Sequence, residues 1–415
     1  MSELVNLFPH QERVLNETYD LNRVAYYLDM GLGKTFVGSE KLWELNTPYN
    51  LVICQKSKID DWKEHFEEFY PEYKVVIFDK QSLDIIPPES ILIVNYDKVW
   101  RRPEINRLRD FTLMLDESSM IKNERSNRSK FVLQLHAKNV ILLSGTPTGG
   151  KYEELISQVN LLGWNISKDL FLKQYTIREW DELDGGYKII GYQRTERMKK
   201  KLREHGAIFM KTEEVFDLPL QNHINVKCKC PKVYKDFSKH HMVEIDSELL
   251  IGDTPASAKM YLRQLAGAFN KNKLDQLKDL MESTNDRLII FYQFKRDYEA
   301  IKLICEELKR PISTINGEIK DLDAYEKQES SVSLIQYQAG AMGLNLQKAN
   351  KIIYFTLTDM SELFEQSKKR IHRIGQDKPC FYYYLLTEGT IEWRMLQVLK
   401  ERKDYSDALF ESEEM

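Results

Sequence analysis

The stretch Asp29-Met30-Gly31-Leu32-Gly33-Lys34-Thr35 decides the fold of this chain. It follows an apolar run, Val24–Leu28, that is typical of a strand, and it precedes a helix-like segment from Phe36 to Leu45. A strand that leads through a glycine-rich turn into a helix can hold a triphosphate. Backbone N–H groups converge on the phosphate oxygens, a lysine neutralises charge, and a hydroxyl reaches the magnesium ion. The strict pattern has a glycine where this chain has Leu28, so a tight strand–helix connection is the alternative for this stretch alone.

Length and composition indicate a folded protein of two or three domains. The chain has 415 residues, of which 42% are hydrophobic and 30% charged. No apolar run approaches the about 20 residues that span a bilayer, and Met1-Ser2-Glu3 does not begin an export signal. The five cysteines are scattered, and the pair Cys228 and Cys230 has no second pair at metal-ligand spacing. We therefore expect reduced thiols, no membrane partner and a cytoplasmic location.

The charge balance excludes a surface that is basic throughout. The net charge is −4 and the isoelectric point about 6.2. A local basic groove can still bind phosphates while the rest of the surface is acidic. The densest basic stretch, Arg194 to Arg203, fits either a solvated helix face or a contact with DNA.

Strand-like and helix-like segments alternate regularly through the first part of the chain. Short, nearly continuous apolar runs suit strands that are buried on both faces of a parallel sheet. The runs are Leu51–Cys54, Val75–Phe78, Ile91–Val94, Leu113–Leu115 and Val140–Leu143, with a helix predicted over Ile59–Phe69. This order predicts a doubly wound α/β domain, whose ligand site lies at the carboxyl ends of the strands.

Polar residues stand at those strand ends. Asp116 and Glu117 follow the run that ends at Leu115. A carboxylate there can hold magnesium while its neighbour activates water, although an acidic loop would look the same. Ser144-Gly145-Thr146-Pro147 ends the Val140 run and could sense a phosphate, and Gln11 could read an adenine edge because its amide both donates and accepts.

A second α/β lobe is predicted after a charge-rich middle region. From Trp164 to Lys271 apolar runs are sparse, and we expect a mainly helical insertion without chemistry of its own. Alternation then resumes with strand candidates Arg287–Tyr292, Ile312–Ile315, Val332–Ile335, Ile352–Phe355 and Phe381–Leu386. Two lobes imply a cleft between them.

The most informative stretch of that lobe runs from Gln366 to Gln376 and is rich in basic residues. Its sequence is Q-S-K-K-R-I-H-R-I-G-Q. On a helix, Gln366, Arg370 and Arg373 would share one face. Guanidinium groups presented to a γ-phosphate stabilise charge on the transferring phosphoryl group. A solvated basic helix is the alternative for this stretch in isolation. His372 is read as structural rather than as a general base.

In order and content these segments resemble the Swi/Snf-type branch of the superfamily-2 helicase-like ATPases. The resemblance runs from Leu7 to about Lys400. It rests on the nucleotide loop (29–35), two DNA-contact motifs (52–62 and 93–97), the acidic box (115–119, then 121–123), the coupling motif (143–147), a motif touching DNA and nucleotide (338–346), the arginine motif (366–376) and a closing segment (387–392). Ser118-Ser119 stands where the family usually has Ala-His, which predicts altered coupling. Gln338 and Ala341 replace a basic residue and a glycine, which predicts a weaker DNA contact.

The resemblance implies two RecA-like lobes with the helical insertion between them, and ATP with Mg²⁺ as cofactors. The expected domains are 1–163, 164–271, 272–404 and an acidic tail, 405–415. The implied catalytic residues are Lys34, Asp116, Glu117, Gln366, Arg370 and Arg373, with Thr35 and Asp116 on the metal. The implied nucleotide-binding residues are Gln11, Met30, Gly31, Leu32, Gly33, Lys34, Thr35 and Gly343. The implied DNA contacts are Lys56, Tyr96, Phe294, Lys295 and Gln338.

The function that the resemblance implies is an ATP-dependent double-stranded-DNA translocase. Its partners would be duplex DNA and a DNA-bound protein as cargo, with the chain acting as a monomer. Compact members of this kind are typical of bacteria and their phages. Two alternatives stay open: a helicase that separates or anneals strands, and a nucleotide-gated DNA clamp without productive turnover.

Overall fold

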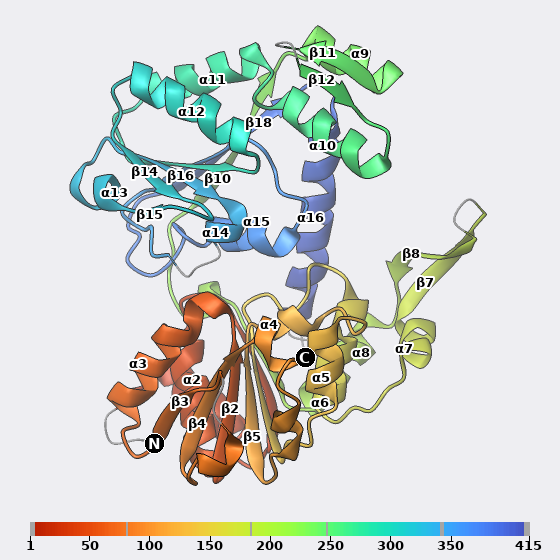
Figure 1. The fold of residues 1–415 in the computed structure, drawn as a ribbon, viewed down its shortest axis with the longest axis vertical. Helices are drawn as coiled ribbons and strands as arrows, with labels where there is room; N and C mark the ends of the chain where they lie inside the picture. Colours follow the sequence, from red (N-terminus) through yellow and green to blue (C-terminus); the bar gives the residue numbers. More distant parts are fainter. Residues whose placement is uncertain (1–4, 80–81, 183–184, 246–247, 341–343, 411–415) are drawn as a thin grey trace. The chain divides into compact units, whose positions relative to one another are not determined.

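The computed structural model describes residues 5–79, 82–182, 185–245, 248–340 and 344–410. It divides into two compact units, Met1–Val215 together with Asp404–Met415, and Phe216–Lys403. Each unit is built on a seven-stranded, largely parallel sheet with helices packed against it (Figure 1). The predicted pair of α/β lobes is therefore confirmed.

The first sheet is entirely parallel and has the strand order β3-β4-β2-β5-β6-β1-β9. Its strands are β1 (Arg23–Leu28), β2 (Tyr49–Cys54), β3 (Lys74–Ile77), β4 (Ser90–Asn95), β5 (Phe111–Asp116), β6 (Asn139–Leu143) and β9 (Ala207–Met210). In this order β6 lies between β5 and β1. The acidic pair after β5, the Ser144 turn after β6 and the glycine loop after β1 therefore meet at one edge of the sheet.

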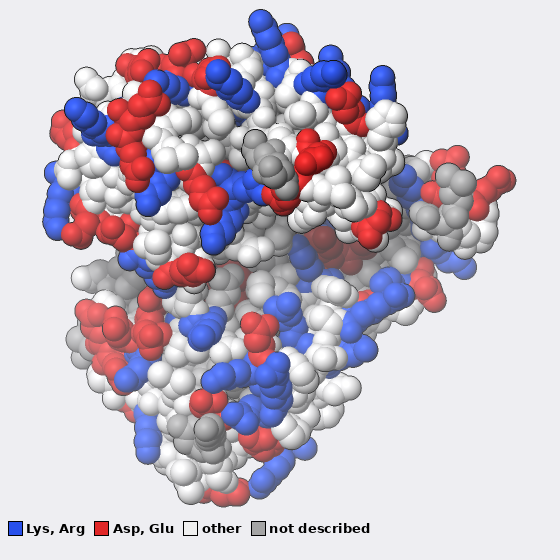
Figure 2. Space-filling view, turned by 45° about the horizontal axis from the view of Figure 1, so that its top comes forward, with Lys and Arg blue, Asp and Glu red and all other residues white. Residues whose placement is uncertain are grey.

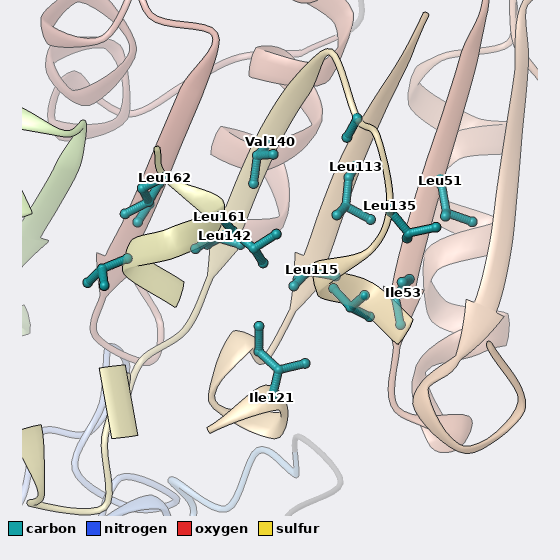
Figure 3. Packing of buried hydrophobic residues seen from close by; sticks show 14 of the residues in the cluster. Leu51, Ile53, Leu113, Leu115, Ile121, Leu135, Val140, Leu142, Leu161 and Leu162 are labelled. Atoms are coloured by element: carbon teal, nitrogen blue, oxygen red, sulfur yellow. The ribbon is translucent and has the colours of Figure 1, made fainter. Parts of the chain in front are cut away.

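Both faces of the central strands of this sheet are buried, as their apolar runs predict. Leu51 and Ile53 of β2, Leu113 and Leu115 of β5 and Leu142 of β6 belong to one cluster (Figure 3). The alternate residues of the same strands, among them Val52, Met114 and Ile141, are also completely buried. Apolar side chains on both faces of a strand must be shielded from water on both faces. In a parallel sheet, helices packed on each face provide this burial.

The first unit contains eight whole α-helices and six short 3₁₀ turns within the described ranges. The helices are α1 (Pro9–Glu17), α2 (Lys34–Leu45), α3 (Ile59–Phe69), α4 (Tyr96–Val99), α5 (Asn127–Leu133), α6 (Ile156–Leu161), α7 (Lys168–Tyr175) and α8 (Thr195–Glu204). The 3₁₀ turns are η1 (Lys56–Lys58), η2 (Leu83–Ile85), η3 (Pro103–Arg107), η4 (Ser118–Ile121), η5 (Tyr152–Leu155) and η6 (Thr212–Glu214). A two-stranded ribbon, β7 (Thr176–Asp181) with β8 (Gly186–Tyr192), projects from this unit (Figure 1).

The second sheet has the order β10-β18-β17-β13-β16-β14-β15 and is parallel except for the last pair. Its strands are β10 (Gln221–Cys228), β13 (Leu288–Tyr292), β14 (Ile312–Ile315), β15 (Lys320–Asp321), β16 (Val332–Gln336), β17 (Lys351–Tyr354) and β18 (Cys380–Thr387). The helices are α9 (Lys232–His240), α10 (Pro255–Ala266), α11 (Lys271–Glu282), α12 (Lys295–Glu307), α13 (Asp323–Lys327), α14 (Tyr337–Gly340), α15 (Ser361–Lys368) and α16 (Ile391–Phe410). Strands β11 (Met242–Ile245) and β12 (Glu248–Ile251) form a separate hairpin.

The middle region is shared between the two units. Residues 164–271 contain helices, as expected, but also the two hairpins and strands β9 and β10, which the sequence did not indicate. The chain passes from one unit to the other after Val215, so the predicted limits at 163 and 271 fall inside the units. The predicted tail, 405–415, likewise begins inside α16, which continues to Phe410.

No α-helix in the described part of the chain is long and apolar enough to cross a membrane. On the face visible in Figure 2, Lys and Arg side chains are interspersed with Asp and Glu, in keeping with the small net charge.

Candidate active site

The glycine loop turns between the end of β1 and the start of α2. Gly31 and Gly33 have φ values of 91° and 73°, and Gly33 is the residue that caps α2. A Cβ atom on Gly33 would lie 2.0 Å from Gln11 Nε2, so only glycine fits there. Lys34 Nζ donates hydrogen bonds to the carbonyl oxygens of Leu28 (2.8 Å) and Asp29 (3.1 Å), which holds the ammonium group inside the loop. Thr35 is exposed in the first turn of α2.

Gln11 braces this loop from α1. Its side chain is 3% exposed, and Nε2 donates to the carbonyl oxygens of Leu32 (3.3 Å) and Gly33 (3.4 Å). Its Oε1 accepts from the backbone N–H of Phe8 at 2.8 Å. The structure thus places Gln11 beside the loop, with its amide engaged by the backbone. Its role in reading adenine stays a prediction.

Asp116 ends β5 and is held by an aromatic partner from α3. Its Oδ2 accepts a hydrogen bond from the indole N–H of Trp62 at 2.9 Å. Burial raises the pKa of Asp116 above its usual value, while the indole bond and the charges of Lys34 and Lys58 act in the opposite direction. Sequence reasoning missed Trp62 as a carboxylate partner. The signal was that a tryptophan on a buried helix face needs an acceptor for its N–H.

Glu117 adopts the left-handed region, with φ of 55°, which costs a residue with a side chain roughly 1–3 kcal/mol. Two side chains hold it there. The Tyr96 hydroxyl donates to the carbonyl oxygens of Asp116 (2.9 Å) and Glu117 (3.3 Å), and Ser144 Oγ donates to Glu117 Oε2 at 3.2 Å. Ser144 Oγ also accepts from the Thr146 N–H at 3.1 Å, so the turn after β6 supports the carboxylate.

The glycine loop and the acidic pair meet at this turn. A Cβ atom on Gly145 would lie 3.3 Å from Lys34 Nζ, which shows how closely the turn approaches the lysine. The glycine loop after β1, the acidic pair after β5 and the Ser144 turn after β6 therefore lie together at one edge of the first sheet. The arrangement offers a cation, a helix N-terminus, a hydroxyl and two carboxylates to one ligand.

The predicted DNA contacts of the first unit have different environments. Lys56 is exposed in η1, directly after β2. Tyr96 is only 1% exposed, and its hydroxyl is used by the backbone of the acidic pair. This burial speaks against the predicted contact between Tyr96 and DNA and gives Tyr96 a supporting role instead.

In the second unit, the predicted DNA contacts follow two neighbouring parallel strands. Phe294 and Lys295 come after β13, and Gln338 comes after β16. Lys295 and Gln338 are exposed, whereas Phe294 is half-buried with the Arg263 guanidinium 5.0 Å from its ring centre. Their roles stay predictions. Gly343, with Ala341 and Met342, lies outside the described residues.

The arginine motif does not form the continuous helix that its spacing predicts. Helix α15 ends at Lys368, so Gln366 lies on it while Arg370 and Arg373 lie in the turns that follow. The Gln376 side chain fixes these turns by donating to the carbonyl oxygens of Ala349 (2.8 Å) and Gln347 (3.1 Å), and Gly375 adopts φ of 87°. The prediction that Gln366, Arg370 and Arg373 share one helical face is therefore wrong.

The two arginines also differ in exposure. Arg370 is 1% exposed, and its Nη1 donates to the carbonyl oxygen of Leu344 at 3.5 Å. Arg373 is half-buried and donates to the Asn345 side chain, and burial lowers its pKa. Both arginines thus contact residues of the motif 338–346, which the resemblance assigns to DNA and nucleotide contacts. A ring nitrogen of His372 forms a hydrogen bond with the carbonyl oxygen of Pro219 at 2.9 Å, which supports its structural interpretation.

Comparison with known proteins gives consistent matches. The family model of the SNF2-related domain matches residues 13–274, and that of the helicase conserved C-terminal domain matches residues 272–375. Among curated relatives, SWI/SNF-related matrix-associated actin-dependent regulator of chromatin subfamily A member 1 of Mus musculus is 24% identical over 89% of this chain and 40% of its own length. The putative ATP-dependent helicase/translocase YwqA of Bacillus subtilis is 24% identical over 93% of this chain and 46% of its own length.

The chain therefore spans less than half the length of these two curated relatives. Among solved structures, the Sulfolobus solfataricus SWI2/SNF2 ATPase core in complex with dsDNA aligns over 98% of this chain and 93% of its own. That alignment has 21% identity and a TM-score of 0.48.

Proposed function

We propose, from the premise that this chain belongs to the SNF2-related family, that it is an ATP-driven translocase on double-stranded DNA. One observation carries the proposal. The glycine loop, the Asp116–Glu117 pair and the Ser144 turn lie at the carboxyl ends of β1, β5 and β6, with Lys34 between the loop carbonyls and Gly145. The Bacillus subtilis relative is named a putative helicase/translocase, which agrees with this activity.

The first unit would bind the triphosphate. Lys34 would leave its loop carbonyls to neutralise the phosphates, which the N-terminus of the twelve-residue helix α2 also attracts. The Thr35 hydroxyl and the Asp116 carboxylate are oxygen donors of the kind magnesium prefers when it also binds phosphates, so they fit that ion. When bound, magnesium would neutralise charge on the transferring group. It would also favour the ionised form of Asp116, against the effect of burial.

Glu117 would position the attacking water. A carboxylate that orients water must be held still, and Ser144 Oγ and Tyr96 hold its side chain and backbone. Arg373 of the second unit would stabilise charge on the transferring phosphoryl group, a contribution that is typically 10³–10⁵ in rate. Arg370 is proposed to support this step rather than to touch the phosphate, because its side chain is buried. Gln366, half-buried on α15, is proposed to take part in the step.

Each unit carries its own exposed candidate contacts with DNA. Lys56 belongs to the first unit, and Lys295 and Gln338 belong to the second. A change in the nucleotide state would shift these two contacts relative to each other and so move the chain along the duplex.

We further propose that the chain works as a monomer in the cytoplasm, which would be the host cytoplasm if the chain is encoded by a phage. A DNA-bound protein would be its cargo.

The deciding experiment measures ATP hydrolysis at fixed salt with duplex DNA, single-stranded DNA, RNA or no nucleic acid. Duplex DNA should stimulate turnover, and the stimulation should fall steeply as salt rises, because phosphate contacts release counterions. Stimulation by RNA or single strands alone would overturn the choice of substrate. Displacement of a triplex strand without unwinding of a fork would distinguish translocation from strand separation.

The same assay tests the assigned residues. Lys34→Ala or Glu117→Gln should abolish hydrolysis while leaving the fold intact, whereas Glu64→Gln on the exposed side of α3 should have no effect. Near-normal turnover in both site variants would refute the assignment. Tight DNA binding by the unaltered chain without any hydrolysis would favour the nucleotide-gated clamp.

A further inference from the structure

Directly behind the acidic pair lies a buried polar network centred on Gln158 of α6. Gln158 Oε1 accepts hydrogen bonds from Ser118 Oγ (2.7 Å) and from the Tyr27 hydroxyl (3.0 Å). Gln158 Nε2 donates to the carbonyl oxygen of Pro147 at 2.8 Å. The side chains of Gln158, Ser118 and Tyr27 are all completely buried. These contacts lie within the first unit, so they do not depend on how the two units are placed.

A buried amide of this kind is costly unless it is satisfied. An unpartnered polar group inside a protein costs about 1–3 kcal/mol, so a buried glutamine needs partners for both ends of its amide. Here both ends of the amide are used. An apolar side chain would fill the same position on α6 without that requirement. The network therefore indicates a function beyond the filling of space.

Two of the three partners of Gln158, Ser118 and Pro147, lie in segments next to Glu117. Ser118 directly follows Glu117, whose backbone is in the left-handed region. Pro147 directly follows Thr146, and the N–H of Thr146 donates to the Ser144 hydroxyl that contacts Glu117 Oε2. One amide thus ties the backbone beside Glu117 to the turn that contacts the carboxylate of Glu117.

We propose that Gln158 is a positioning residue for the hydrolytic step and that it acts through the Ser118 hydroxyl. It fixes the acidic pair relative to the Ser144 turn, so that the Glu117 carboxylate stays aimed at the water it orients. This inference rests on the proposed function, which assigns that role to Glu117. Without the tether, ATP should still bind, because the glycine loop and Lys34 are not part of the network.

Two hydroxyl groups that donate to the same oxygen atom supply a matched pair of variants. Ser118→Ala and Tyr27→Phe each remove one donor to Gln158 Oε1 and leave the other in place. Only Ser118→Ala removes a hydrogen bond that tethers the segment of the acidic pair, since Tyr27 belongs to β1. If the network merely stabilises the core, the two variants should behave alike.

The test measures kcat and KM for ATP at saturating duplex DNA, together with thermal unfolding. For Ser118→Ala we expect kcat to fall about tenfold, the effect of one lost transition-state interaction of hydrogen-bond size, with KM for ATP unchanged. For Tyr27→Phe we expect kcat within about twofold of the unaltered chain. Gln158→Leu should lower kcat at least as much as Ser118→Ala, and adding Ser118→Ala to it should cause little further loss. If Gln158→Leu does not fold, the comparison of Ser118→Ala with Tyr27→Phe still tests the inference.

Glu117→Gln separates this inference from the proposed function. If that variant hydrolyses ATP normally, the proposed function is wrong. If it is inactive, the inference is overturned in any of three cases: Ser118→Ala keeps normal turnover, Tyr27→Phe loses as much as Ser118→Ala, or the loss in Ser118→Ala lies in KM.

Discussion

Arg370 and Arg373 are three residues apart, but their side chains differ in exposure. A guanidinium group that is 1% exposed cannot contact a phosphate without a rearrangement of its surroundings, and Arg370 is in that position. Arg373 is half-buried and burial lowers its pKa, which means that its charge is incompletely solvated. A partly desolvated guanidinium interacts more strongly with an anion than one in free water.

Arg373→Ala should therefore lower turnover by about 10³-fold or more while leaving ATP binding intact. Arg370→Ala should instead lower the stability of the second unit, because it removes a buried side chain. Steady-state hydrolysis, nucleotide binding and thermal unfolding of both variants provide the measurements. An unchanged rate in Arg373→Ala would remove its role, and Arg373→Lys shows whether charge alone suffices.

We expect His65 to couple the stability of the first unit to pH. It lies on α3, 9% exposed, with its Nε2 2.9 Å from Ser39 Oγ and with Phe36 and Phe69 rings around it. Burial lowers the pKa of His65 to about 4 from 6.5. Between these values the unfolded chain binds the proton and the folded one does not. His65 therefore contributes stability that is fully present above pH 6.5 and is lost as the pH falls toward 4.

We expect the unaltered chain to lose about 1.4 kcal/mol per pH unit through His65 within this window. His65→Gln has no such titration, so the difference in unfolding temperature between the two proteins should shift in favour of the variant as pH falls from 6.5 to 4. Calorimetry at several pH values measures that difference. A difference that does not change with pH would show that His65 titrates normally.

At the scale of elements, α11 and α16 are joined by a buried ion pair. Lys273 Nζ lies 2.5 Å from Glu392 Oε1, and the two side chains are 0% and 3% exposed. The second carboxylate oxygen of Glu392 accepts from the Thr387 N–H at 2.8 Å, at the end of β18. The pair therefore connects two helices to the sheet of the second unit. Removing only one partner would leave a charge in the interior.

Lys273→Met should destabilise the second unit by about 3–5 kcal/mol for that reason. Lys273→Met combined with Glu392→Gln should recover much of the loss, since no buried charge then remains. Urea unfolding of the two variants gives the comparison. Equal stability of Lys273→Met and the unaltered chain would mean that Glu392 is neutralised or solvated.

How far the sequence predicts this fold depends on where each strand lies in its sheet. Central strands such as β2 and β5 are buried on both faces, so their apolar runs identify them. Strand β10 lies at a sheet edge with Gln221, His223 and Asn225 exposed, and it therefore has no apolar run to recognise. Strand β10 is determined by its pairing with a distant strand, β18, and that information is not local. The edge strand β3 was predicted because it keeps an apolar run, Val75–Ile77.

The same limit applies to the site. Lys34, Asp116 and Glu117 were predicted because their chemistry is tied to strand ends. Trp62 and Gln158 were missed because a hydrogen bond between distant segments leaves no spacing pattern. The predicted helix also ends earlier than the spacing of Gln366, Arg370 and Arg373 suggested. After Lys368, the side chain of Gln376 and the conformation of Gly375 determine the turns.

At the scale of the whole molecule, the chain connects its two units twice, at residues 215/216 and at 403/404. The second connection lies within α16. Beyond it, Tyr405 packs against two tyrosines of the first unit, with ring centres 5.9 Å from Tyr152 and 5.0 Å from Tyr192. The Tyr152 hydroxyl donates to the carbonyl oxygen of Tyr405 at 3.1 Å. This end of α16 is thus bound to the first unit by side-chain contacts rather than by a continuous sheet or core.

Tyr405→Ala should release that end of the helix. Each aromatic pair contributes about 0.5–1.5 kcal/mol, so two pairs give roughly 1–3 kcal/mol, which corresponds to a rise in local opening of about 5-fold to 150-fold. Hydrogen exchange at the backbone amides of residues 404–408 measures this opening directly. Tyr405→Phe keeps the ring and should exchange as slowly as the unaltered chain, because the Tyr152 bond uses the backbone carbonyl. Equal exchange in Tyr405→Ala would show that the ion pair between Lys211 and Asp407, 3.6 Å apart, suffices to hold the segment.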